Sequence, residues 1–237
     1  MKQMILAAGF AVASLVGGAA NALTLQLDGF SSGSLGSVTI NDAPVNDHLT
    51  NVGASGFNMT DTAPGGLGSF EAWCLDVSHL LMGVGDSQVY NQTNNPFSSS
   101  FGLTTVARDR VQAVFDANYA TLDSGNVNQA AAFQMALWEA AFEDDNGSLG
   151  LGFGDFIASA NNTIVGFAES FLSNATSYTG SKLFNLSFFE VEGDENRARD
   201  TGQNIVTASV VPLPAAGLLL LTGLLGAGAL SRRRSKT

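Results

Sequence analysis

The sequence predicts an α+β fold: a mixed short-strand sheet or β-barrel-like body with two to three inserted helices, plus a C-terminal transmembrane helix. Two observations predict the body. Residues 23–90 are rich in Gly, Ser, Thr and Asn around short apolar alternations, whereas residues 104–174 carry apolar side chains at helical spacing. A third predicts the membrane helix: Val210–Leu230 is a run of 21 residues without a charge, which as a helix extends roughly 30 Å, the thickness of a bilayer core.

Strands are expected near both ends of the body. Apolar and polar residues alternate over 23–27 and 38–40. Residues 70–77 (FEAWCLDV) place apolar side chains on both faces, which predicts a central strand covered on both sides. Residues 183–192 and 203–211 complete the extended segments.

Three helices are expected between these strands, over residues 104–122, 126–143 and 155–174. Asn126 and Asp155 stand where N-caps belong, because their side-chain oxygens can accept from the first free backbone N–H groups.

The N-terminus has the pattern of a secretory signal peptide. Lys2 precedes an apolar stretch, and small residues at positions 20–22 resemble a cleavage site. We therefore predict a signal peptide over residues 1–22, export through the Sec pathway, and an exported body over residues 23–210.

The C-terminus has three parts in order: a proline-containing motif, an apolar helix over about residues 213–231, and a basic cluster over residues 232–236 that includes Arg232, Arg233 and Arg234. Positive charge next to an apolar helix stays on the cytoplasmic side. A buried helix with a basic cap is the alternative interpretation. The motif residues are Val211, Pro212, Leu213, Pro214 and Ala215.

This tail, residues 211–237, resembles the VPLPA variant of the PEP-CTERM sorting signal. The resemblance implies a Gram-negative protein, anchored at least transiently in the inner membrane and processed by a membrane-embedded exosortase. Its destination is then the cell surface or extracellular matrix, in association with exopolysaccharide or biofilm. Residues 213–217 also resemble a sortase pentapeptide, but Ala216 stands where that motif has Thr.

The predicted body is strongly acidic. Five of the ten Lys and Arg residues lie within 23–210 together with all 21 Asp and Glu residues, so its net charge is −16. Nucleic acid requires a basic surface, and nucleic-acid partners are therefore not expected.

Cys74 and Gln134 are the two residues of the body that carry candidate chemistry. Cys74 is the only cysteine, so no intramolecular disulfide can form, and a buried cysteine acting as a small apolar residue is one interpretation. On a helical wheel of residues 127–143, Gln134 falls inside the apolar arc, whereas Glu139 and Glu143 fall on the polar face. A satisfied core amide is the corresponding interpretation for Gln134.

Residues 73–76 (WCLD) and 131–138 (AAFQMALW) together resemble the signature of bacterial thioester domains, which are adhesive surface domains. The resemblance implies a thioester between the Cys74 sulfur and the Gln134 acyl carbon, able to capture a surface amine or hydroxyl. Trp73, Phe133 and Trp138 would shield it. The match is partial, because Phe133 stands where the signature has Thr and Leu137 where it has a β-branched residue.

Other chemistry has little support in the sequence. A hydrolase would have to use His48 or His79, and neither is accompanied by a glycine-flanked nucleophilic serine. No cofactor loop or metal-ligand spacing is present, so no enzyme activity, cofactor or metal is expected. Two hypotheses remain: a non-enzymatic matrix or surface protein in which Cys74 and Gln134 are structural, and a covalent adhesin that uses their thioester.

Overall fold

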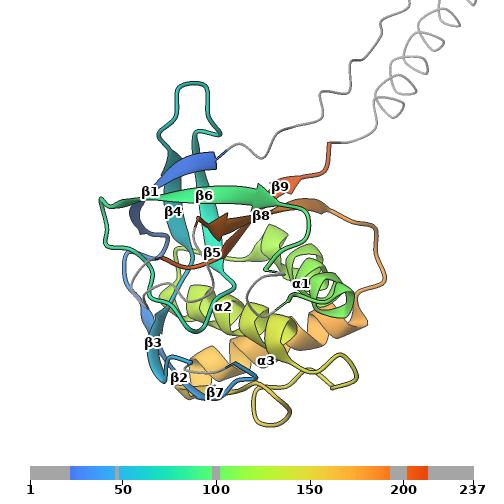
Figure 1. The fold of residues 1–237 in the computed structure, drawn as a ribbon. Coiled ribbons are helices and arrows are strands. Elements are labelled where there is room, and N and C mark those ends of the chain that lie inside the picture. Colours follow the sequence, from blue (N-terminus) through green and yellow to red (C-terminus); the bar gives the residue numbers. More distant parts are fainter. Residues whose placement is uncertain (1–21, 46–47, 98–101, 193–201, 213–237) are drawn as a thin grey trace, which may run out of the picture.

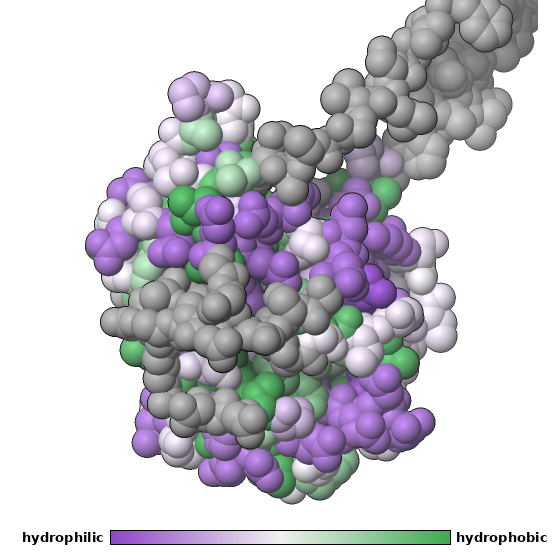
Figure 2. Space-filling view, in the orientation of Figure 1, coloured by the Kyte–Doolittle hydropathy of each residue, from purple (hydrophilic) through white to green (hydrophobic). Residues whose placement is uncertain are grey.

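The computed structural model describes residues 22–45, 48–97, 102–192 and 202–212 of the 237-residue chain. Within these ranges the predicted α+β class is confirmed: a closed six-stranded barrel packs against three helices and a small three-stranded sheet. Figure 1 shows the barrel above the helices, with the small sheet beside them. The face in Figure 2 is largely hydrophilic, with apolar residues scattered between polar ones.

Six antiparallel strands form the barrel: β1 (Ala22–Phe30), β4 (Phe57–Asp61), β5 (Ser69–Cys74), β9 (Ile205–Val210), β8 (Phe184–Val191) and β6 (Ser87–Thr93). This is also their spatial order, and β6 pairs with β1 to close the ring. In β5, Ala72, Trp73 and Cys74 are all buried, because the strand is covered on both faces. The prediction of a central strand is confirmed for residues 70–74, whereas residues 75–77 lie beyond its end.

The small sheet brings a second layer against the helices. Its strands are β2 (Gly36–Asp42), β3 (Asn51–Ala54) and β7 (Ile157–Ala160), with β2 in the middle. A Cβ at Gly36 would overlap the Cβ of Ala131, so the absence of a side chain at Gly36 allows the sheet to approach the helix that carries Gln134.

The helices are α1 (Thr105–Asn118), α2 (Val127–Phe142) and α3 (Asn162–Ser177), with a short 3₁₀ turn η1 (Tyr119–Thr121) after α1. They contact one another, and α2 also contacts β2, β3 and β5. The predicted cap of the second helix is confirmed, because the Asn126 side chain accepts from the N–H groups of Asn128 and Gln129.

The prediction for the third helix was wrong at its start. The helix begins at Asn162 and is capped by Asn161, whose side chain accepts from Thr163 and Ile164. The preceding residues form β7 instead, because pairing with the edge of β2 satisfies their backbone groups. Asp155 is no cap; its own N–H is donated to the Glu143 carboxylate.

The prediction of a polar face on α2 was also wrong at Glu139 and Glu143. Glu139 is fully buried and Glu143 is 5% exposed, because the loop after α2 folds back over them. Glu139 Oε1 accepts from Gly150 N–H at 2.6 Å, and Glu143 Oε2 accepts from Asp155 N–H at 2.9 Å. These carboxylates supply acceptors for backbone donors that no strand or helix pairs.

Arg110 of α1 fastens the start of the same loop. Its guanidinium donates to the backbone carbonyl oxygens of Glu143, Asp144, Asp145 and Gly147, at 2.6 to 3.2 Å. The C-terminal end of α2 is therefore held by the loop, through Glu139 and Glu143, and by Arg110 of α1.

Most of the two predicted terminal segments lies outside the described residues. These include residues 1–21 of the signal peptide, the transmembrane helix at about 213–231, and Leu213, Pro214, Ala215, Arg232, Arg233 and Arg234. Of the sorting motif, Val211 and Pro212 are described, and Val211 N–H is donated to the carbonyl of Leu183. No helix within the described ranges is long and apolar enough to cross a bilayer.

The buried Glu139 carboxyl makes the stability of the fold depend on pH. Burial raises its pKa from 4.5 to about 8, and the nearby Glu143 and Glu169 carboxylates add to the increase. The folded state therefore keeps a proton that the unfolded chain releases near pH 4.5. The contribution of Glu139 to the free energy of unfolding is fully present below about pH 4.5 and is lost as the pH rises to about 8.

We predict that Glu139→Gln, which cannot ionise, reduces this loss by on the order of a few kcal/mol. Thermal unfolding midpoints followed by circular dichroism at about pH 5 and about pH 9 measure the effect. Glu192→Gln is the control, because the Glu192 side chain is exposed and is not among the groups that change the pKa of Glu139. It should leave the wild-type profile nearly unchanged. Parallel profiles for wild type and Glu139→Gln would contradict the assignment.

Candidate functional site

Cys74 is the last residue of β5 and is 4% exposed. It lies opposite Ile205 of the neighbouring strand β9. The N–H of the next residue, Leu75, donates to the backbone carbonyl oxygen of Asn204, on the β9 side. Because backbone groups alternate along a strand, the N–H and C=O of Cys74 point away from β9, toward the side of β4.

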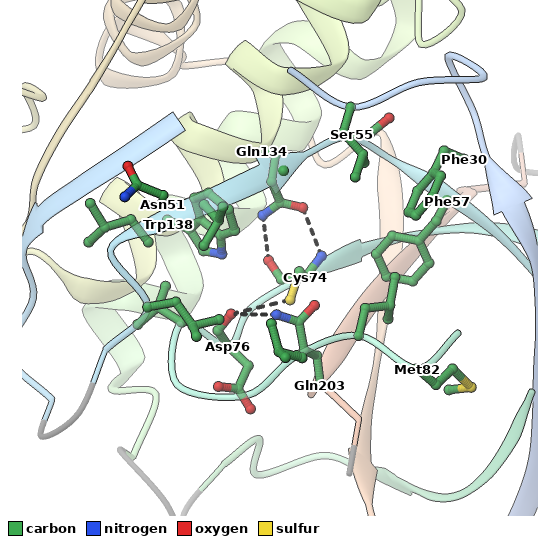
Figure 3. A pocket seen from close by; sticks show the side chains of 18 residues that line it. Phe30, Asn51, Ser55, Phe57, Cys74, Asp76, Met82, Gln134, Trp138 and Gln203 are labelled. Atoms are coloured by element: carbon green, nitrogen blue, oxygen red, sulfur yellow. Dashed lines mark hydrogen bonds between the residues drawn. The ribbon is translucent and has the colours of Figure 1, made fainter. Parts of the chain in front are cut away.

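Strand β4 has no residue opposite Cys74 that could pair with its N–H and C=O groups. Its register with β5 begins at Phe57 opposite Ala72, so Cys74 extends beyond the start of β4. Gln134 of α2 takes the place of the missing strand, as Figure 3 shows. Cys74 N–H is donated to Gln134 Oε1 at 2.9 Å, and Gln134 Nε2 donates to the Cys74 carbonyl at 2.7 Å.

The sequence thus placed Gln134 correctly inside the protein: it is 1% exposed. Both of its polar atoms are paired, so the cost of burying the amide is compensated. The same pairing holds the side-chain carboxamide of Gln134 against the backbone of Cys74, the two residues that the thioester signature joins.

The Cys74 thiol lies among carbonyl oxygens. Its Sγ is 3.3 Å from the carbonyl oxygen of Asp76 and 3.9 Å from that of Asn204. Both contacts suit the protonated thiol, which is a weak donor. The carbonyl oxygens around it thus hold the sulfur in place.

Cys74 and Gln134 both line a cavity of about 230 Å³ between the barrel, α2 and the small sheet. Most of its wall is apolar, from residues such as Ile40, Leu81 and Met82. Figure 3 shows the carboxamide and the sulfur at this wall. A small group that enters the cavity can thus approach both side chains.

The three predicted shielding aromatics lie in two places. Trp138 is 3% exposed and lines the cavity. Trp73 and Phe133 are not among its described lining residues; they pack edge to face, with ring centroids 4.7 Å apart, in the core between barrel and helices. Only Trp138 is thus positioned at the cavity wall.

Asp76 and His79 form a turn just beyond Cys74. The Asp76 carboxylate accepts from the N–H groups of Ser78 and His79, and the His79 ring Nδ1 lies 2.9 Å from Asp76 Oδ2. The two residues thus close a turn just beyond the end of β5.

Sequence reasoning missed Gln203 and Asn204, which complete the surroundings of Cys74. Gln203 Nε2 donates to the carbonyl oxygens of Asp76 and His79, at 3.3 and 2.6 Å. Asn204 Oδ1 accepts from Val191 N–H at 3.1 Å. The signal in the sequence that could have indicated them is a pair of adjacent side-chain amides directly before the apolar residues of β9.

Within the described ranges, no group of three or more His, Cys, Asp or Glu side chains is arranged to hold a metal ion. The acidic segment 143–147 holds its carbonyl oxygens toward Arg110 instead.

Comparisons with known proteins give a likeness in fold only. No family model matches the chain, and no curated protein matches it. Similar solved structures include the N-terminal thioester domain of a surface protein from Clostridium perfringens, a cysteine-to-alanine mutant, at 10% identity and a TM-score of 0.42. That match covers 74% of this chain and 99% of the other.

A second similar structure is the N-terminal domain of the Streptococcus pyogenes pilus tip adhesin Cpa. It shares 13% identity with a TM-score of 0.39, over 74% of this chain and 93% of that one. The sequence identities and TM-scores of both matches are low. What the site can do chemically therefore follows from the arrangement of Cys74 and Gln134 in this chain.

We predict that Gln134→Ala destabilises the fold, because it removes the hydrogen bonds that the buried Cys74 N–H and C=O make with Gln134. Each such group costs about 1–3 kcal/mol, so the free energy of unfolding, measured by urea denaturation, should fall by roughly 2–5 kcal/mol. Gln129→Ala is the matched control on the same helix, because its side chain makes only an exposed hydrogen bond at 3.3 Å. Equal losses for the two variants would show that the pairing with Cys74 contributes nothing specific.

Proposed function

We propose that the body over residues 23–210 is an exported, non-enzymatic surface domain that attaches covalently through a thioester between Cys74 and Gln134. The observation that carries the proposal is that the Gln134 carboxamide is paired with the backbone of the only cysteine, and that both residues line the same cavity. A thiol, an acyl carbon and room for a third group are the three requirements of such a site.

The bond forms without a cofactor. The Cys74 sulfur attacks Cδ of Gln134, the C–N bond breaks, and the thiol proton leaves with the nitrogen as ammonia. Cys74 N–H already donates to Oε1 of the carboxamide at 2.9 Å, so it polarises the carbonyl that is attacked.

The product is a stored acyl donor. A primary amine or a hydroxyl on a target surface attacks the same carbon, the C–S bond breaks, and the sulfur takes back a proton. The partner is then joined to Gln134 by an amide or an ester. The low exposure of both residues, 4% and 1%, limits the competing attack by water.

Delivery is part of the same proposal. The signal peptide sends the chain through the Sec pathway, and the tail from Val211 to Thr237 holds it in the inner membrane until an exosortase-type enzyme processes it. The domain then acts at the cell surface or in the extracellular matrix of a Gram-negative bacterium. Extracellular polysaccharide and surface amines are the partners that fit, whereas the net charge of −16 over residues 23–210 disfavours nucleic acid.

A structural role for Cys74 and Gln134 in the same exported protein is the second candidate. The two hydrogen bonds that satisfy the Gln134 amide favour it, because a satisfied core amide requires no further function. The two candidates differ by one covalent bond, which a mass measurement detects.

We predict that intact mass spectrometry of the purified body gives a mass about 17 Da below the sequence mass, through loss of one ammonia. Cys74→Ala should abolish the deficit, and treatment with methylamine should convert it to an adduct on Gln134 located by peptide mapping. Cys74→Ala is also the control for deamidation elsewhere. A full sequence mass in freshly purified protein, with a thiol that titrates and no methylamine adduct, would favour the structural role.

We further predict that a Gram-negative host with an exosortase releases a mature protein that lacks Leu218–Thr237. Pro212→Ala combined with Pro214→Ala should leave the tail attached, because the recognised motif is changed while the apolar helix is kept. Thr222→Ala, within the apolar run, is the control and should be processed normally. A mature mass that includes Arg232–Arg234 in the wild type would exclude this processing.

A further inference from the structure

One wall of the cavity is formed by an irregular segment rather than by a helix or a strand. Residues 76–82 belong to the connection from β5 to β6, which contains neither. We call residues 76–82 the lid segment. It begins two residues after Cys74, whose Sγ lies 3.3 Å from the carbonyl oxygen of Asp76, so it bounds the cavity on the side of the sulfur. Its cavity-lining residues are Asp76, Val77, Leu80, Leu81 and Met82.

Gln203 ties the lid segment to the barrel. Its Nε2 donates to the carbonyl oxygens of Asp76 at 3.3 Å and of His79 at 2.6 Å. Gln203 stands two residues before the start of β9, and β9 is paired on both sides, with β5 and β8. In Figure 3 Gln203 and Asp76 lie on the side of Cys74 opposite Gln134. A side chain at the base of a paired strand thus holds the loop in place.

This connection lies directly beside the thiol. The carbonyl oxygen of Asp76 is 3.3 Å from Cys74 Sγ and also 3.3 Å from Gln203 Nε2. Gln203 itself lines the cavity and is 8% exposed. The bonds that keep the lid segment in place are therefore at the reactive end of the cavity, and breaking them changes access to the sulfur.

The cavity also has lining residues at the protein surface. Leu35 and Leu80 both line it and are 43% and 48% exposed. A small reagent can therefore enter past them into a space of about 230 Å³. Leu80 belongs to the lid segment, so displacement of that segment widens the entrance. A bulky group requires this displacement to reach Cys74, which is only 4% exposed.

We propose that residues 76–82 are a lid on the cavity of Cys74 and Gln134, and that Gln203 is the positioning residue that keeps this lid closed. While its two hydrogen bonds are made, only small groups reach the pair; a bulky partner enters when they break. The inference rests on the proposed function for its purpose, which is to control what reaches the thioester. Its test uses only the thiol, so the lid and the thioester can each fail alone.

The experiment measures access to Cys74 with two maleimides of different size. Cys74 is the only cysteine, so each reagent labels one position. Hydroxylamine first opens any thioester: its nitrogen bonds to Gln134 Cδ, the C–S bond breaks and the sulfur takes up the proton. N-ethylmaleimide is the small reagent and N-(1-pyrenyl)maleimide the bulky one. Intact mass spectrometry at pH 7 gives both rates, each relative to the rate with free cysteine.

Gln203→Ala should raise the rate of the pyrenyl reagent about tenfold, because that rate follows the population of the open state and two hydrogen bonds that oppose opening are lost. The rate of N-ethylmaleimide should stay within about twofold of wild type. Gln112→Ala is the matched control. Gln112 Nε2 also donates to a backbone carbonyl, that of Phe184 at 3.0 Å, at the start of β8; its loss should leave both rates within about twofold.

Gln203→Glu separates the hydrogen bonds from packing and serves if Gln203→Ala does not fold. It keeps the length of the side chain but places a carboxylate oxygen against the carbonyl oxygens of Asp76 and His79. The same acceleration of the pyrenyl reagent supports the inference, and a wild-type rate overturns it.

Three further results would overturn the lid. One is equal relative rates for the two reagents in the wild type, because nothing then hinders the bulky one. Another is an equal acceleration of both reagents by Gln203→Ala. The third is an acceleration by Gln112→Ala as large as that by Gln203→Ala, because access would then follow the overall stability of the fold.

Discussion

The exchange of two hydrogen bonds between the Gln134 carboxamide and the Cys74 backbone is the interaction on which the arrangement of this protein depends. It joins residues 60 positions apart and connects the helical layer with the barrel. Strand β5 extends past the start of β4, and the Gln134 side chain from α2 pairs with the backbone at its end. The cavity lies where these elements meet, and both residues of the pair line it.

Buried polar side chains also pair with backbone groups at the ends of β8 and in the loop after α2. Asp116 accepts from the N–H groups of Leu183 and Phe184 at the start of β8, and Asn204 accepts from Val191 at its end. Glu139 and Glu143 do the same for the loop after α2. A small closed barrel has short strands whose ends cannot all pair, and buried polar side chains satisfy the remaining groups. This explains why so many buried positions here are polar.

This pairing of buried side chains with backbone groups also explains which parts of the structure could not be predicted from the sequence. The strand at Cys74, the α2 helix with its Asn126 cap and the burial of Gln134 follow from local spacing, and the structure confirms them. The burial of Glu139 and Glu143 depends on a loop that folds back over the helix, and the start of α3 depends on pairing with β2. Neither is encoded in helical periodicity. The proximity of Gln134 to Cys74 was predicted from the resemblance to a family signature, because no spacing rule joins two residues so far apart in the chain.

Strand β9 determines how the domain transmits mechanical tension. Its first residue, Ile205, pairs with Cys74, and its last, Val210, leads directly into the tail. At about 3.3 Å per residue the two ends are about 17 Å apart. Antiparallel partners flank β9 on both sides, β5 and β8. Tension applied along β9 is therefore resisted in shear by β8 over the whole strand and by β5 at Ile205 and Val206.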